Sequence, residues 1–529
     1  MTEWDVVVAG GGPAGAVCAI ELTRSGRRVL LLDAEPQPRY RIGESLSPTA
    51  CAAFESYGID LRTAGFVGKS GATFVWGDRP PFATYYADAA AWQVRRADLD
   101  RQVQETAAQA GATVRTGCRV DRVLLSCDRV RVSYLADGGS RCDVEASWVV
   151  DATGRDAVLA RQRDLLDTDP ALDYHAVWAY WHGGLRLPGR AAGNTLFVGG
   201  SPMWWYLPVD DKENVVGVGM VGPGGAPPAD AEAAYRGALG RSPLVRELLG
   251  DARRSGPVRS AGASAQLSRR IGGPGWLLAG DAAGFVDPIL APGVQLAVHF
   301  GQLAARTVHA ALTEPAQTTG LVQEYERRVR RQHDGYRRLA INMYAEAGSQ
   351  SPNPPLDALA GGDEQPDRLT FMSVISGIPP HHLPPMLGGY LATRGAAVRY
   401  GGKPPAFGEV EGFAFLSWVL RHPEMQRPPL APDSVLALAH GVVAGDIPVL
   451  PASGNDVPRS QRVVHNATGD RFLLTRELET MMRILAGEVS FADATKQFGA
   501  AFGADPDPEE FGRWIGLLGR HGLVAWKPA

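Results

Sequence analysis

The chemistry available to this chain begins at a glycine-rich turn near its N-terminus. The hexapeptide Gly10–Gly15 has the form G-x-G-x-x-G, follows the apolar run Val6–Ala9 and opens a predicted helix. In this pattern one glycine allows a tight turn, the next lets the backbone approach a pyrophosphate, and the third lets the helix pack on the strand. Asp33 ends the next apolar run about 20 positions later, where a carboxylate binds a ribose hydroxyl. The pattern predicts a dinucleotide site built from Gly10, Gly12, Ala14, Gly15 and Asp33.

A second feature with chemical meaning is the pair Gly280-Asp281, which ends the apolar run Trp276–Ala279. A carboxylate at a strand end accepts hydrogen bonds from a polyol such as ribitol. A long helix is predicted from Val294 to about Leu312. Its N-terminus favours negative charge, such as that on the pyrimidine end of a reduced flavin. Together with the first glycine turn, these residues favour FAD over NAD.

Lys69 and the aromatic run Trp204-Trp205-Tyr206 each allow two interpretations. A lone lysine in a turn before a strand is typical of a solvated side chain. An aromatic run is typical of a core, but it can also form a flat wall for an aromatic substrate.

The elements that position these residues predict an α/β fold. Strands alternate with helices as far as about residue 155, and a β-rich, aromatic stretch from about 170 to 265 precedes the return to Gly280. This order predicts a Rossmann-like FAD-binding domain with an inserted β-sheet substrate domain. We expect a core over 1–345, a proline-rich helical cap over 346–460, with a helix at Phe413–Leu420, and a winged-helix-like module of three helices and a strand over 461–529.

Composition narrows the classes of function. The net charge of the 529 residues is −4, and from Arg471 onward there are seven Lys or Arg and eight Asp or Glu, which disfavours nucleic-acid binding. The five cysteines lack metal-ligand spacing, so we predict no metal site. Without a signal peptide or a run long enough to span a bilayer, we expect a soluble cytoplasmic protein that does not bind membranes.

Four segments between about residues 5 and 345 resemble the flavin-dependent halogenases, a branch of the FAD monooxygenases. They are the family's P-R-x-x-[VI]-G-E-S as Pro38–Ser45, its catalytic-lysine segment as Phe66–Gly77, its V-x-R-x-x-[FL]-D as Val94–Asp100 and its G-D-A-A-x-F-V-D-P as Gly280–Pro288. The resemblance implies the FAD monooxygenase fold and the catalytic residues Lys69 and Glu44. It also implies further cofactor contacts at Arg39, Ser45, Arg96, Gly280, Asp281, Pro288, Gly293 and Val294.

The activity implied by this resemblance is halogenation. In the family, FADH2 from a separate flavin reductase reacts with O2 and chloride or bromide, and the resulting hypohalous acid reaches a lysine that directs it onto an electron-rich carbon. The implied substrate is a phenol- or pyrrole-like natural-product intermediate, free or tethered to a carrier protein, with Trp204 and Trp205 as the substrate wall. C-terminal extensions in the family cover the substrate entrance, and here the extension could also dock a carrier protein.

Two departures from the family's pattern keep alternatives open. Met203 replaces the first tryptophan of W-x-W-x-[IL]-P, and Ala291-Pro292-Gly293 replaces a hydroxyl-bearing sequence near the halide. Pro292 has no N–H, so a halide would depend on the N–H groups of Gly293 and Val294 and on the helix dipole. The alternative is a flavin-dependent hydroxylase, oxidative tailoring enzyme or prenyl-chain reductase that uses no halide; a non-catalytic flavin-binding regulator is a third hypothesis.

Overall fold

A computed structural model describes residues 4–37, 41–62, 64–76, 81–85, 91–126, 128–288, 291–347, 430–449, 459–465, 467, 471–473, 476–502, 508–520 and 522–527. The described residues up to 347 belong to one compact unit, and those from 430 onward belong to a second. Each unit has its own hydrophobic core. The division of the C-terminal part at about residue 460 stays a prediction.

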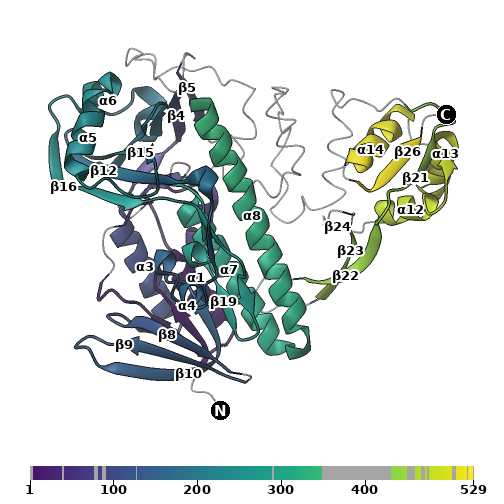
Figure 1. The fold of residues 1–529 in the computed structure, drawn as a ribbon, viewed down its shortest axis with the longest axis horizontal. Helices are drawn as coiled ribbons and strands as arrows, with labels where there is room; N and C mark the ends of the chain where they lie inside the picture. The colour runs from purple at the N-terminus through teal and green to yellow at the C-terminus, as the bar shows by residue number, and fades with distance from the viewer. Residues whose placement is uncertain are drawn as a thin grey trace. The chain divides into compact units, whose positions relative to one another are not determined.

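The first unit is built on a mostly parallel sheet, as the sequence predicts (Figure 1). Its order is β18-β19-β10-β1-β2-β7, and the hairpin of β8 and β9 extends from β10. Helices cover the strands, and β2 and the last four residues of β1, Val6–Ala9, are accordingly buried apolar runs. The strands are β1 (Trp4–Ala9), β2 (Val29–Leu32), β7 (Thr113–Arg115), β8 (Arg119–Leu125), β9 (Val130–Leu135), β10 (Arg141–Asp151), β18 (Gly272–Gly273) and β19 (Trp276–Leu278).

Three helices beside this sheet carry several of the predicted cofactor residues. They are α1 (Pro13–Arg24), α3 (Arg96–Gln109) and α7 (Pro292–Thr313). Helix α1 packs against both of the others. Parallel pairing of β1, β2, β10 and β19 puts their carboxyl ends at one edge of the sheet, which is where open α/β sheets bind ligands.

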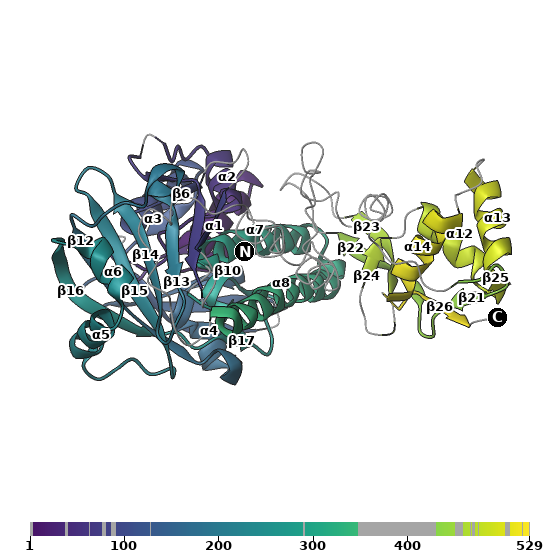
Figure 2. The same ribbon diagram turned by 90° about the horizontal axis from the view of Figure 1, so that it is seen from above.

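A second sheet of seven strands follows the order β16-β12-β15-β14-β13-β4-β5. It takes in the expected β-rich stretch and also two strands from before α3, because β13 pairs in parallel with β4. Its members are β4 (Gly71–Val75), β5 (Phe82–Tyr85), β12 (Tyr174–His182), β13 (Thr195–Val198), β14 (Met203–Asp210), β15 (Val215–Pro223) and β16 (Arg253–Gly262). Helices α5 (Ala231–Gly240) and α6 (Pro243–Leu249) pack on one of its faces (Figure 2).

The long helix α8 and several short elements complete the first unit. Helix α8 (Thr318–Ala347) packs along α7, and its last residue lies close to Gly199 at the end of β13. The short β3 (Val67–Lys69) pairs with β6 (Ala91–Gln93), and β11, β17 and β20 form a further small sheet. The remaining elements are α2 (Pro48–Ser56), α4 (Val158–Gln162), β11 (Leu166–Thr168), β17 (Gln266–Ser268) and β20 (Gly284–Phe285), with 3-10 turns at 154–156, 170–172, 189–193, 280–282 and 315–317.

The second unit contains the three predicted C-terminal helices, and its strands form two small sheets, β25-β21-β26 and β22-β23-β24. Its elements are β21 (Val435–Leu438), β22 (Val443–Val449), β23 (Arg459–His465), β24 (Arg471–Leu473), α12 (Arg476–Ile484), β25 (Val489–Ser490), α13 (Phe491–Phe502), α14 (Pro508–Arg520) and β26 (Val524–Lys527). The winged-helix likeness stays a prediction, and the expected helix at Phe413–Leu420 lies outside the described residues. A membrane-spanning helix is absent from the described part of the chain.

Candidate active site

The glycines of the first turn serve different purposes. Gly10 has a φ of +102°, and a Cβ there would overlap the Ala152 carbonyl, while a Cβ at Gly15 would overlap the Gly10 carbonyl. These two glycines are required by the fold itself. At Gly12, in contrast, a Cβ would meet no described atom within 4 Å. The first-turn N–H groups of α1 have no helical partner and no side-chain cap among the described residues. This open, donor-lined cradle fits a pyrophosphate.

Asp33 lies beside this cradle at the end of β2, where the sequence places a ribose contact. Its Oδ2 accepts a hydrogen bond of 2.6 Å from Gln104 Nε2, which also donates to the Gly11 carbonyl at 2.8 Å. Burial raises the pKa of the Asp33 carboxyl, against the hydrogen bonds and a nearby Arg41 that lower it. Gln104 comes from α3, and its role leaves no local signal in the sequence.

Asp281 lies at the return to the nucleotide domain. Burial raises the pKa of its carboxyl, and Arg155, Arg96 and Arg41 oppose that rise. Gly280, with a φ of +62°, packs so closely on α1 that a Cβ would lie 2.9 Å from Ala14 Cβ. The structure therefore brings Ala14 and Asp281 into one region, as a flavin dinucleotide requires. Pro288 is half-buried after this segment, and Arg39 lies outside the described residues.

The Arg96 guanidinium, predicted to contact the cofactor, makes three hydrogen bonds within the protein. Its Nε and Nη2 each donate to Asp100, both at 3.0 Å, and Nη1 donates to the Ile42 carbonyl at 2.9 Å. A Cβ at Gly43 would lie 2.9 Å from Arg96 Nη1 and 3.7 Å from Val294 Cγ2. The segment 41–47, which we call the strap, thus runs between α3 and the first turn of α7.

Glu44 lies on the strap and is buried, with 5% of its surface exposed. Tyr180 Oη, from β12, donates to its Oε1, and the Gly43 N–H donates to its Oε2 at 2.9 Å. Burial raises the pKa of the Glu44 carboxyl, while Tyr180, the backbone N–H groups and Arg96 act in the opposite direction. Glu44 therefore links the strap to the seven-stranded sheet.

Lys69 ends β3 and points to the same strap. Its Nζ donates to Ser45 Oγ at 2.9 Å and to the Leu46 carbonyl at 3.4 Å. Burial lowers the pKa of Lys69 to about 8, so the side chain can change charge near neutral pH. Ser45 Oγ accepts from Lys69 and lies 3.1 Å from Thr195 Oγ1. Its contact with the cofactor stays a prediction.

The two tryptophans predicted as a substrate wall lie on opposite faces of the seven-stranded sheet. Trp205 packs with Phe74, Phe197 and Trp178 on the face that Tyr180 shares. Trp204 packs in the α5 and α6 core, its ring centroid 5.6 Å from that of Tyr235. Alternation along a strand separates neighbours in this way, so only Trp205 remains available as a wall on the strap side.

The first turn of α7 is the predicted halide position. Ala291 precedes it with a φ of +51°, a left-handed conformation that is unfavourable for a residue with a Cβ. Pro292 follows as the first helical residue and has no N–H to donate. A Cβ at Gly293 would meet no described atom within 4 Å, and Val294 Cγ2 lies 3.7 Å from where a Cβ would be at Gly43 of the strap. The first turn of α7 therefore lies beside the strap, and the halide contacts of Gly293 and Val294 stay a prediction.

Comparison with known proteins decides the family. Residues 3–226 match a family model described as an FAD binding domain. The chain is 31% identical over 342 residues to the flavin-dependent halogenase armH3 of Armillaria mellea, covering 58% of this chain and 68% of the relative. The chain belongs to the flavin-dependent halogenase family.

Other comparisons agree with this family and its fold. A 1H-pyrrole-2-carbonyl-[peptidyl-carrier protein] brominase of Pseudoalteromonas luteoviolacea is 29% identical, with 59% of this chain and 78% of the relative covered. The solved structure of CmlS, a flavin-dependent halogenase, is 21% identical and covers 100% of this chain and 97% of its own, with a TM-score of 0.74. At 21% identity, this structural match is evidence for the fold alone.

FAD is the cofactor of this halogenase. The open position at Gly12, the paired Asp33 and Gln104, and the arginine-flanked Asp281 fit its pyrophosphate and polyol. The prediction of an FAD-dependent oxidoreductase with an α/β FAD-binding fold is therefore confirmed.

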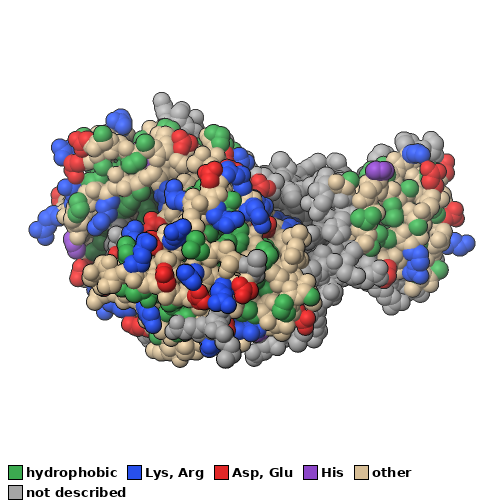
Figure 3. Space-filling view, turned by 60° about the horizontal axis from the view of Figure 1, so that its bottom comes forward, with side chains coloured by type: hydrophobic (Ala, Val, Ile, Leu, Met, Phe, Trp, Pro, Cys, Tyr) green, Lys and Arg blue, Asp and Glu red, His purple; other side chains and the backbone are tan. Residues whose placement is uncertain are grey.

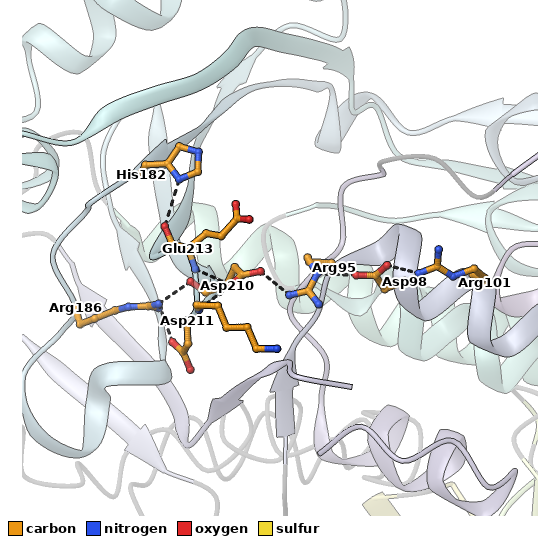
Figure 4. A network of polar contacts seen from close by, with 9 residues as sticks. Arg95, Asp98, Arg101, His182, Arg186, Asp210, Asp211 and Glu213 are labelled. Carbon is orange, nitrogen blue, oxygen red and sulfur yellow. Dashed lines mark hydrogen bonds and ion pairs between the residues drawn. The ribbon is translucent and has the colours of Figure 1, made fainter. Parts of the chain in front are cut away.

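A polar network that the sequence analysis missed anchors the β14–β15 hairpin of the halogenase (Figure 4). Arg95, just before α3, lies between Asp210 and Asp98 and donates to each at 2.6 Å. Asp210 Oδ1 also accepts the Lys212 N–H at 2.8 Å and the Glu213 N–H at 3.0 Å. Because Trp205 is on β14, this network fixes the aromatic face relative to α3. Arg95 and Asp210 are 115 residues apart, and no local pattern in the sequence indicates their contact.

Proposed function

We propose that this protein is an FADH2- and O2-dependent halogenase of an electron-rich aromatic substrate, phenol- or pyrrole-like. Lys69 is its catalytic residue, and Glu44, which the family resemblance also assigns to catalysis, acts by positioning the strap that Lys69 contacts. The observation that carries the proposal is the contact between Lys69 and the strap. The strap touches the first turn of α7 at Gly43 and the aromatic sheet face through Glu44. Lys69 Nζ donates to Ser45, the residue of the strap that follows Glu44.

The chain's own residues supply binding and positioning. Bound FAD supplies the redox and oxygen chemistry. Gly12, Ala14 and Gly15 offer backbone N–H groups to its pyrophosphate, and Asp33 and Asp281 accept from its hydroxyls. The Gly293 and Val294 N–H groups, at the positive end of α7, hold the halide. Arg96 and Val294 keep the strap against this region.

Lys69 directs the halogen onto the substrate. As an ammonium group it is a compact donor that holds hypohalous acid by a hydrogen bond. The aromatic carbon then takes the halogen, the hydroxyl leaves with the displaced ring proton as water, and the atoms balance. Trp205, on the sheet face shared with Tyr180, supplies a flat apolar surface for the ring. Glu44, held by Tyr180, keeps the strap and its Lys69 contact in place.

Three further observations support the substrate class and the partners. One relative is named for a pyrrole substrate on a peptidyl carrier protein, which supports a carrier-tethered substrate here. A separate flavin reductase supplies FADH2, since the second G-x-G-x-x-G of the sequence, Gly217–Gly222, lies within strand β15 and not at a strand-to-helix turn that could bind a nicotinamide dinucleotide. Basic and acidic side chains are intermixed on the face of the first unit in Figure 3. That mixture suits a small molecule or a protein better than a nucleic acid.

The deciding experiment compares the wild type with Lys69→Ala in the presence of a flavin reductase, NADH, a phenol or pyrrole panel and bromide. We expect Lys69→Ala to bind FAD and consume O2 normally but to lose at least about a hundredfold in brominated product. Undiminished bromination by Lys69→Ala would contradict the catalytic assignment. An oxygenated product that forms equally well without chloride or bromide would instead establish the halide-free oxygenase. The absence of a hydroxyl at Ala291 and of an N–H at Pro292 favours that alternative.

The halide position has its own test, an anomalous diffraction map of FAD-bound crystals soaked in bromide. We expect a bromide peak at the Gly293 and Val294 N–H groups. A site without bromide there would contradict the proposed halide contacts.

A further inference from the structure

Lys69 is connected to a chain of buried polar side chains, of which only Ser45 belongs to a family motif. Its Nζ donates to Ser45 Oγ at 2.9 Å, and Ser45 Oγ lies 3.1 Å from Thr195 Oγ1. Gln93 Nε2 donates to Thr195 Oγ1 at 3.0 Å and to the Gly193 carbonyl at 3.1 Å. Ser45, Thr195 and Gln93 are 5%, 2% and 0% exposed, so solvent does not substitute for these partners.

The chain is assembled by backbone pairing between distant segments. Lys69 pairs with Ala91 in the β3–β6 ribbon, and Ser45 forms a bridge with Gln93. A Cβ at Gly193 would overlap the Gly68 carbonyl, so a glycine there lets the residues before β13 reach β3. The strap, β3, β6 and β13 thus meet at one point, on the sheet face where Thr195 alternates with Phe197.

The chemistry of these groups allows the chain to serve Lys69 in two states. An amide nitrogen only donates, so Gln93 Nε2 fixes Thr195 Oγ1 as an acceptor. The hydroxyls of Thr195 and Ser45 can each donate and accept. Ser45 Oγ can therefore accept from an ammonium group, with its own proton turned toward Thr195. It can also donate to a neutral amine while it accepts from Thr195.

We propose that Ser45, Thr195 and Gln93 act as a positioning chain that holds Lys69 Nζ at one point in both of its charge states. The inference rests on the proposed catalytic role of Lys69 and extends it to residues that do not touch the substrate. A lysine with four rotatable bonds loses reach and direction easily, and displacements of about 1 Å in a catalytic group cost about a hundredfold in rate. The chain removes that freedom without occupying the aromatic face.

The test compares two valine substitutions of buried threonines in adjacent strands of the same sheet. Thr195→Val breaks the chain, whereas Thr73→Val, the control, removes a hydroxyl that pairs with Asn194 at 3.1 Å on the other face. We expect Thr195→Val to lower kcat for halogenation at least about tenfold with KM unchanged within about twofold. FADH2 oxidation should stay at the wild-type rate, and Thr73→Val should match the wild type in all three quantities. Equal behaviour of the two variants would overturn the proposal.

A second readout does not depend on turnover. The rate of Lys69 acylation by acetic anhydride, followed by peptide mass spectrometry across pH, reports the charge state of the amine. The Cys51 thiol on α2 is an ionisable group that also acts on Lys69. We expect Ser45→Ala, which removes the acceptor of the ammonium form, to move the midpoint to lower pH and Thr195→Val to move it less. An acylation midpoint that is unchanged in both variants would contradict the positioning chain. Halogenation by Lys69→Ala at the wild-type rate would contradict only the catalytic role of Lys69.

Discussion

At the scale of single residues, the glycine turn separates what the fold needs from what the ligand needs. Gly10 and Gly15 approach other backbone atoms so closely that any side chain would overlap them. Gly12 faces open space, so the requirement for a glycine there comes from the pyrophosphate. The same comparison applies to Gly293 at the first turn of α7, which also faces open space.

This distinction predicts that Gly12→Ala lowers FAD affinity without lowering the stability of the apoprotein. The methyl group meets no described protein atom but lies where the cofactor's pyrophosphate approaches the backbone. Titration of the apoprotein with FAD, followed by flavin fluorescence, measures the Kd, and urea unfolding measures the stability. Gly15→Ala is the contrasting variant and should destabilise the apoprotein by more than about 2 kcal/mol. A wild-type Kd in Gly12→Ala would place the pyrophosphate elsewhere.

The charge of Lys69 gives a second prediction at this scale. Burial lowers its pKa to about 8, so the ammonium form predominates at pH 7 and is lost as the pH rises through 8. If the ammonium group holds hypohalous acid, kcat for halogenation falls above about pH 8. Single-turnover rates with pre-reduced FAD between pH 6 and 10 measure this. A rate that instead rises through pH 8 would show that the neutral amine is the reacting form.

At the scale of elements, glycines in β15 create the space for the aromatic face. A Cβ at Gly219 would overlap the Trp205 indole, and a Cβ at Gly217 would lie 3.1 Å from the Tyr180 ring. Gly219→Ala therefore displaces Trp205, and we expect a loss of about 1–3 kcal/mol in stability together with weaker substrate binding. Urea unfolding and KM measure the two effects. Gly237→Ala in α5, where the nearest atom is 3.7 Å away, should be neutral or stabilising.

The β14–β15 hairpin supplies the second prediction for an element. Burial disfavours the charge of Asp210, but the Glu213 and Lys212 N–H groups and Arg95 outweigh it and lower its pKa. A carboxyl whose pKa is lowered by folding stabilises the protein above its unfolded pKa and loses that contribution as the pH falls through the folded value. Asp210→Asn should therefore lower the free energy of unfolding by about 1 kcal/mol at pH 7. The deficit should shrink below about pH 4, near the unfolded carboxyl pKa.

Tryptophan fluorescence during urea unfolding at pH 7 and pH 3.5 measures this difference. Asp211→Asn is the matched control, because Asp211 is 65% exposed and pairs with Arg186 on the surface. It should change stability by less than about 0.5 kcal/mol at either pH. A pH-independent deficit in Asp210→Asn would show that the lost packing, and not the lost charge, causes the effect.

At the scale of the whole molecule, the limits of prediction from sequence follow the distance between partners. The strand, turn and helix around Gly12 are encoded by neighbouring residues, and their pattern predicted the α/β fold and FAD. Lys69 was distinguished from a solvated lysine only by its resemblance to a family segment, and its role stays a prediction. Gln93 and Thr195 are 102 residues apart, so their contact depends on sheet register that no local pattern encodes.

Register and backbone conformation account for the other differences from expectation. Trp204 and Trp205 are adjacent in the sequence, and the pairing of β14 with its neighbours decides which of them faces the strap. The left-handed conformation of Ala291 was not predicted either, because it belongs to a residue type that rarely adopts it. Both features depend on the assembled fold.

The division into two compact units gives the last prediction. The residues that fit FAD all lie in the first unit, so FAD should stabilise that unit alone, by about 2.7 kcal/mol at a free concentration 100 times its Kd. Scanning calorimetry of the full chain should show two transitions, of which FAD moves only one to higher temperature. In Gly12→Ala the same FAD concentration should move neither. If FAD shifts both transitions of the wild type together, the units unfold as one cooperative structure, and the C-terminal unit contributes to the stability of the flavin site.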